Sequence, residues 1–131
     1  MVEAACGLLD RSNLGGSFEI GVGGIGGFPK LEKPRVIWTG INGDIDKLNK
    51  LLKMVESCAC RCGVARDLGK FSPHITLGRC GGSAPLAEST LQMIKEDEIS
   101  LPSWRVEEII MMKSELTCSG PIYTPLKIFK L

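Results

Sequence analysis

The nine residues of Phe71–Arg79, Phe-Ser-Pro-His-Ile-Thr-Leu-Gly-Arg, constrain the fold of this chain most, and they contain its only histidine. Polar and branched apolar residues alternate there, which is the pattern of a β-strand with one buried face. The alternation predicts that His74 and Thr76 share one face and that Ile75 and Leu77 point inward. An imidazole beside a hydroxyl could transfer protons and donate a hydrogen bond to a phosphate, although a lone histidine can also merely satisfy a backbone group.

The rest of the chain predicts an α+β fold. Apolar residues at three-to-four-residue spacing predict an amphipathic helix between Asp44 and Gly63, and a second helix is expected from Pro85 to Glu96, capped by Ser83. A short helix is expected at residues 2–9, and strands are expected at 18–22, 36–41, 104–114 and 120–131. This order favours antiparallel sheets with helices on their outer faces, in a single domain covering residues 1–131.

A glycine-rich segment matches a nucleotide-binding pattern without its structural context. Residues 21–26, Gly-Val-Gly-Gly-Ile-Gly, fit the dinucleotide fingerprint G-x-G-x-x-G. That fingerprint requires a helix directly after the glycines, and Pro29 and Pro34 prevent one from starting there. We therefore expect a bulged strand, or a backbone that passes close to another segment, and no bound dinucleotide.

Composition limits the partners that this chain can bind. The formal net charge is +1, so attraction to nucleic acid would have to come from a local cluster of cations. No apolar run approaches the roughly 20 residues that span a bilayer, and the first residues lack the pattern of a secretory signal. We expect a cytoplasmic protein that does not bind membranes.

Three of the six cysteines, Cys58, Cys60 and Cys62, alternate at the end of the long predicted helix. Zinc sites usually combine ligand pairs from two separate loops, and no histidine lies near these thiols in the sequence. The spacing favours small core residues, so we expect neither a metal nor another cofactor. A metal-dependent redox protein is a further, weaker alternative, and disulfides are not excluded by the sequence.

Four stretches together carry a resemblance to a known family. They are Phe71–Arg79, Gly24–Thr39, Lys113–Leu116 and Gly120–Tyr123, and they occur in the family's order. The chain resembles the two-histidine (2H) phosphoesterases, and within them the branch of RNA 2',3'-cyclic phosphodiesterases, also called 2'-5' RNA ligases. The resemblance covers the chain from about Ser17 onward. It implies a two-lobed fold in which each lobe contributes one His-x-Thr strand to a central cleft.

The resemblance also implies roles for individual residues. In the family one histidine is the general base and the other the general acid, the threonines hold phosphate oxygens, and no metal is required. Carried over, His74 is an acid–base group and Thr76 a phosphate donor. Arg79 would contact the phosphate or the RNA end, which requires a bulge near Gly78 because strict alternation places Arg79 on the other face. Substrate stacking is assigned to Phe71 and Tyr123, although both also suit a core.

One departure from the family concerns the first His-x-Thr motif, because the chain has a single histidine. Residues 1–10 resemble the end of the helix that follows that motif, so we expect one lobe nearly complete and the other partial. The expected substrate is RNA with a 2',3'-cyclic phosphate or a 2'-5' linkage. A second copy of the chain, as a homodimer, could supply the other histidine, or the missing segment could be encoded elsewhere. The alternative is a catalytically inactive RNA-binding remnant.

Overall fold

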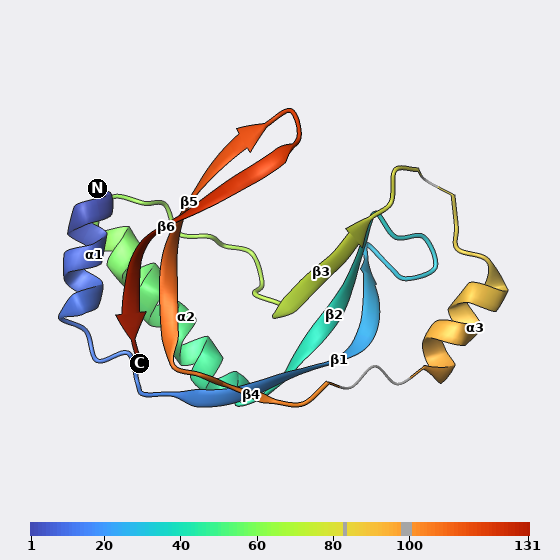
Figure 1. The fold of residues 1–131 in the computed structure, drawn as a ribbon, viewed down its shortest axis with the longest axis horizontal. Coiled ribbons are helices and arrows are strands. Elements are labelled where there is room, and N and C mark those ends of the chain that lie inside the picture. Colours follow the sequence, from blue (N-terminus) through green and yellow to red (C-terminus); the bar gives the residue numbers. More distant parts are fainter. Residues whose placement is uncertain (83, 98–100) are drawn as a thin grey trace. The chain divides into compact units, whose positions relative to one another are not determined.

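The computed structural model describes residues 1–82, 84–97 and 101–131. Its elements in chain order are α1 (Val2–Asp10), β1 (Phe18–Phe28), β2 (Val36–Gly43), α2 (Ile45–Arg61), β3 (His74–Arg79), α3 (Glu88–Glu96), β4 (Trp104–Val106), β5 (Glu108–Thr117) and β6 (Gly120–Lys130) (Figure 1). The chain forms two compact units. Unit 1 comprises Met1–Phe18, Asp46–Leu68 and Arg105–Leu131, and unit 2 comprises Glu19–Ile45 and Gly69–Trp104. Helices combined with antiparallel strand pairs confirm the predicted α+β class.

Unit 1 contains two helices and the β5–β6 hairpin. The hairpin pairs antiparallel from Glu108 opposite Lys130 to Thr117 opposite Gly120. Helix α1 lies beside β6, and the Cys6 Sγ atom is 3.5 Å from the Met111 Sδ atom. Apolar residues from α1, the loop after it, the first position of β1, α2 and β6 form the buried core of this unit: Ala5, Cys6, Leu9, Leu14, Phe18, Leu51, Cys58 and Phe129.

The strand predicted at 104–114 is wrong in one respect, because the structure divides it at Glu107 into β4 and β5. The division follows from strand pairing. Strand β4 belongs to the four-stranded sheet next to β1, whereas β5 pairs with β6 in the hairpin. The chain therefore changes its partner strand at Glu107, and alternation of side chains along the sequence does not reveal such a change.

Unit 2 is built on three antiparallel strands, within a sheet whose order is β3-β2-β1-β4. Strand β1 continues through the glycine-rich segment and is longer than expected. Its register shifts between Gly23 and Ile25, which confirms the predicted bulge. The bulged residue Gly24 has φ +70°, a conformation that side chains disfavour. The buried Thr39 hydroxyl donates a 2.8 Å hydrogen bond to the Gly24 carbonyl and holds the bulge in place.

The long predicted helix is present as α2, where Leu51 and Cys58 are buried. Helix α3 begins at Glu88 after Ala87 as its N-cap, three residues later than expected, and the proposed cap Ser83 lies outside the described residues. None of the helices that the structure describes is long and apolar enough to cross a membrane. The division into one nearly complete lobe and one partial lobe stays a prediction.

Candidate active site

Strand β3 carries the two residues predicted to contact phosphate. It pairs antiparallel with β2, so that His74 lies opposite Gly40 and Thr76 opposite Trp38. Residues directly opposite each other on neighbouring strands project to the same face of a sheet. The imidazole, the hydroxyl and the indole of these residues therefore share one face of unit 2.

Arg79 reaches the same face because β3 contains an irregularity. Thr76 pairs with Trp38, but the next pair along the strands joins Gly78 to Ile37, so Leu77 is the extra residue. Arg79 then lies opposite Val36, two residues before Trp38 on the pleated strand. A shared role for Arg79 and Thr76 requires a bulge near Gly78, and the pairing of β3 with β2 contains one.

The prediction that Ile75 and Leu77 point inward is wrong. Ile75 is 43% exposed and Leu77 is 55% exposed, and every residue of β3 is exposed. Strand β3 is at the edge of its sheet and, among the strands that the structure describes, pairs with β2 alone. Alternation of polar and apolar residues assigned these side chains to the correct opposite face, but that face is not covered within unit 2.

The hydrogen bond of His74 defines which of its ring nitrogens can react. Its Nδ1 atom lies 2.6 Å from the carbonyl oxygen of Ser72. A carbonyl oxygen can only accept, so Nδ1 carries the proton and donates it. In the neutral imidazole this leaves a free lone pair on Nε2, the nitrogen available to take a proton or contact a ligand. The ring is exposed and is not enclosed by aliphatic side chains.

Two aromatic residues that were not predicted as site residues flank His74. The Phe28 and His74 rings are nearly perpendicular, with centroids 5.1 Å apart and planes at 82°. The Trp38 centroid is 6.1 Å from that of His74 and 5.2 Å from that of Phe28. Trp38 lies over Gly26, where an added Cβ would be 2.1 Å from the indole. Both residues belong to the Gly24–Thr39 stretch that carries the family resemblance, which was the only signal for them.

Neither of the two aromatic residues predicted to stack on substrate is in ring contact with His74 in the described part of the chain. Phe71 precedes β3, is 43% exposed and makes no ring contact with another aromatic residue of the described ranges. Tyr123 lies on β6 in unit 1 and is 61% exposed. Exposure at these levels excludes a core role for either ring within its own unit. A base contact by Phe71 or Tyr123 stays a prediction.

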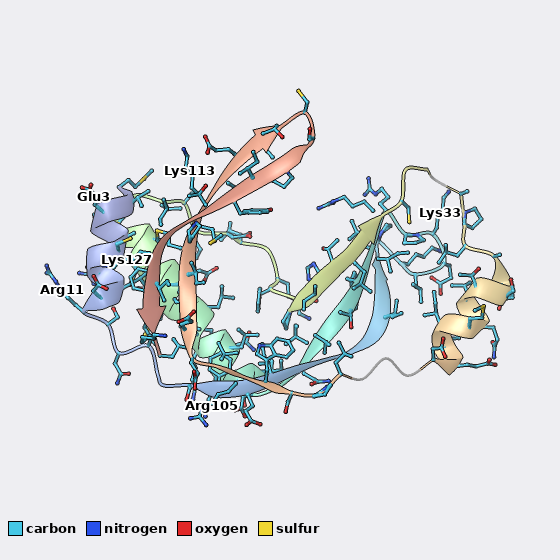
Figure 2. The ribbon with its side chains drawn as sticks, viewed as in Figure 1. Glu3, Arg11, Lys33, Arg105, Lys113 and Lys127 are labelled. Carbon is cyan, nitrogen blue, oxygen red and sulfur yellow. The ribbon has the colours of Figure 1, made fainter. Side chains whose placement is uncertain are left out.

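Positive charge gathers at the end of the sheet where β1, β2 and β3 carry Phe28, Val36 and Arg79. The backbone is tied there, because the N–H of Arg35 donates to the Phe28 carbonyl at 2.7 Å and that of Cys80 donates to the Arg35 carbonyl at 3.0 Å. Exposed cations lie on the loop from β1 to β2 and at the end of β3: Lys30, Lys33, Arg35 and Arg79. Figure 2 labels Lys33 on this loop. None of the four forms an ion pair with a carboxylate of the described residues. They are the kind of local cluster that binding of a polyanion requires.

The cysteines do not form disulfides. All six are free thiols, with Cys58 buried and both Cys60 and Cys62 partly exposed. Among the residues that the structure describes, no group of three or more histidine, cysteine or carboxylate side chains is arranged to hold a metal ion.

Comparison with known proteins identifies the family. The sequence model of the 2'-5' RNA ligase superfamily matches residues 8–117 of this chain. The chain belongs to the 2'-5' RNA ligase superfamily. The resemblance to the 2H phosphoesterases is thereby confirmed.

Members of this superfamily are similar over most of the chain. The RNA 2',3'-cyclic phosphodiesterase of Aeropyrum pernix is 32% identical over 83% of this chain and 62% of its own length. That of Methanothermobacter thermautotrophicus is 32% identical over 87% of this chain and 61% of its own length. The chain thus spans about three fifths of the length of these two superfamily members.

A solved superfamily structure has the same fold over the shared part. The crystal structure of Escherichia coli LigT in complex with 3'-AMP superposes with a TM-score of 0.71 at 27% identity, covering 99% of this chain and 68% of LigT. This chain therefore has the predicted family fold over the part that it shares with LigT.

Proposed function

We propose that this chain carries one acid–base half of an RNA 2',3'-cyclic phosphodiesterase and acts on RNA termini without a metal. The observation that carries the proposal is the exposed His74 imidazole, held at Nδ1 by the Ser72 carbonyl, on the same sheet face as Thr76. Two superfamily members of similar sequence bear this activity in their names, and LigT binds 3'-AMP, which has the form of a product of such a reaction.

The proposed reaction is hydrolysis of the cyclic phosphodiester. A water oxygen attacks phosphorus, Nε2 of His74 takes the water proton, and one ribose oxygen leaves phosphorus and must receive a proton. The Thr76 hydroxyl donates a hydrogen bond to a non-bridging phosphate oxygen, and Arg79 adds a charge-assisted one. His74 alone cannot take one proton and deliver another at the same moment, so the leaving oxygen needs a second acid.

We propose a second copy of the chain as one source of that acid. The chain has a single histidine, and the exposed edge strand β3 leaves a row of backbone groups open to pairing with another chain. Two copies that meet along this edge would each contribute one His74. A longer polypeptide that contains this chain would supply the acid from its own additional residues.

The test compares hydrolysis of adenosine 2',3'-cyclic phosphate by the wild-type chain and by His74→Asn. The asparagine amide can still donate to the Ser72 carbonyl but lacks Nε2, so turnover should fall roughly 100- to 10,000-fold, the usual contribution of general acid–base catalysis. Far-UV circular dichroism should be unchanged because the ring is exposed. Equal turnover by both proteins would refute a catalytic role for His74.

Mixing experiments address the shared site. If each site uses His74 from two copies, excess His74→Asn chain should lower turnover per wild-type chain, since mixed pairs lack one histidine. Sedimentation of the wild type as a monomer at the assay concentration, with turnover unaffected by the variant, would contradict a shared site.

The second candidate function is an RNA-binding protein without catalysis, favoured by the single histidine. It predicts that wild type and His74→Asn bind an oligonucleotide equally well and that neither hydrolyses the cyclic phosphate. Measurable turnover by the wild type, lost in the variant, would exclude it.

A further inference from the structure

We propose that the exposed side of the Phe28 ring binds the nucleobase of the nucleotide whose phosphate lies against His74 and Thr76. The inference rests on the proposed function for the location of the phosphate and goes beyond it by naming the residue that binds the base. Nothing in the sequence pattern selected Phe28, and its contacts in the folded chain carry the argument.

The first step is the distance between Phe28 and the reactive imidazole. The ring centroids are 5.1 Å apart, and the planes are nearly perpendicular at 82°. A phosphate bound at Nε2 of His74 and its attached nucleoside therefore have an aromatic surface within the span of a single nucleotide. At 37% exposure the Phe28 ring is open to solvent beside this site.

The second step is the rigid support of that ring. The Trp38 indole backs Phe28 at 5.2 Å with a tilt of 34°, and it lies directly over Gly26, which has no side chain to displace it. The Phe28 backbone is fixed by its strand partner Val36 and by the hydrogen bond from the Arg35 N–H to its carbonyl. A platform that is already ordered loses little entropy when a ligand stacks on it.

The third step is the chemistry of the surroundings. Lys30, Lys33 and Arg35 lie on the loop that follows Phe28, and Arg79 lies at the end of β3 opposite Val36, the strand partner of Phe28. None of these cations forms an ion pair with a carboxylate of the residues that the structure describes. An exposed aromatic ring among cations is the combination by which proteins bind single-stranded nucleic acid, stacking on the bases while charge holds the backbone. Stacking accepts every base, because each has a π-face, so Phe28 should not confer strict base identity.

The test measures binding of 3'-AMP and of inorganic phosphate to the wild-type chain, Phe28→Leu and Phe28→Tyr by isothermal titration calorimetry. Leucine keeps an apolar side chain but removes the aromatic face, so its dissociation constant for 3'-AMP should rise about tenfold or more. Tyrosine keeps the face and should stay close to wild type. The dissociation constant for phosphate should be the same in all three proteins.

A second measurement follows the base itself. The H2 and H8 protons of adenine should shift upfield in proton NMR when 3'-AMP binds the wild type, because of the ring current of a stacked aromatic. This shift should disappear with Phe28→Leu, and Phe71→Leu tests the base contact predicted for Phe71. Loss of the shift in Phe71→Leu alone would assign the base to Phe71 and overturn the proposal.

Three further outcomes would overturn the proposal that Phe28 binds the base. Equal affinity of the wild type and Phe28→Leu for 3'-AMP overturns the proposal, as does a wild type that binds 3'-AMP no more tightly than phosphate. If Phe28→Leu weakens both ligands equally, the ring orients His74 and does not bind the base, which also overturns it. The proposed function is judged separately, because absence of turnover with stacking intact refutes catalysis alone.

Discussion

Strands β1 and β3 both flank β2, yet they differ in almost every physical respect. Strand β1 lies between β2 and β4 and buries Phe18, Ile20 and Val22, which are at most 9% exposed. Strand β3 lies at the edge, all six of its residues are exposed, and it carries His74 and Thr76. Strand β3, which carries the proposed catalytic residues, thus adds little to the buried core, whereas β1 adds much. Activity and stability should therefore respond to different substitutions.

The largest effect on stability is expected from Phe18→Ala in β1. The side chain is 3% exposed, and truncation of a buried phenylalanine costs about 3–5 kcal/mol through lost burial and a cavity. Urea denaturation followed by circular dichroism measures the loss. The matched control is Phe71→Ala, the same substitution at a ring that is 43% exposed before β3, where the loss should be under about 1.5 kcal/mol. Equal losses would remove the distinction between the two strands.

An intermediate effect is expected from Gly26→Ala, which tests whether β1 supports the site on β3. The new methyl group would lie 2.1 Å from the Trp38 indole, so the ring must move, at a cost of about 1–3 kcal/mol. Because Trp38 backs Phe28 and flanks His74, binding of 3'-AMP should weaken as well, and tryptophan fluorescence should change.

The control for that substitution is Gly78→Ala on β3, where an added Cβ meets nothing within 4 Å. It should leave stability and fluorescence unchanged or raise stability slightly, because alanine restricts the unfolded chain more than glycine does. If Gly26→Ala has the same fluorescence spectrum as the wild type, the position of the Trp38 ring does not depend on the glycine beneath it.

The smallest effect is expected from Ile75→Thr. Threonine keeps the branched shape that strands favour, and the isoleucine is already 43% exposed, so the stability change should be under about 1 kcal/mol. A larger loss that grows with protein concentration would mean that a second chain covers this face. That result would sharpen the comparison, since β3 would then be buried in an assembly and not in the chain itself.

The sequence was sufficient for the features that depend on neighbouring residues. The α+β class, the amphipathic helix α2 and the bulge within the glycines of β1 all follow from local pattern and backbone preferences. The faces of β3 were also correct, because alternation defines which side chains share a side. Whether a face is covered depends on the position of the strand in its sheet, and that information is absent from Ile75 and Leu77 themselves.

The surroundings of His74 could not be derived in the same way. Phe28 is 46 positions earlier in the chain, and it meets the imidazole only because β2 aligns β1 and β3 on its two sides. That alignment depends on the pairing register, which places Phe28 opposite Val36 and His74 opposite Gly40, two residues of β2 on the same face. A shift of one residue turns every later side chain to the opposite face, so no single-strand pattern identifies these neighbours.

The extra residue Leu77 also determines how sites of this kind can be found in other sequences. His74 and Thr76 are two positions apart in the sequence, whereas Thr76 and Arg79 are three positions apart because Leu77 intervenes. A search that assumes uninterrupted two-residue periodicity would reject the arginine as a neighbour of the hydroxyl. If Leu77 were accommodated in an uninterrupted ladder, Arg79 would turn to the face opposite Thr76, so with this sequence a perfectly regular strand would make a poorer anion receptor.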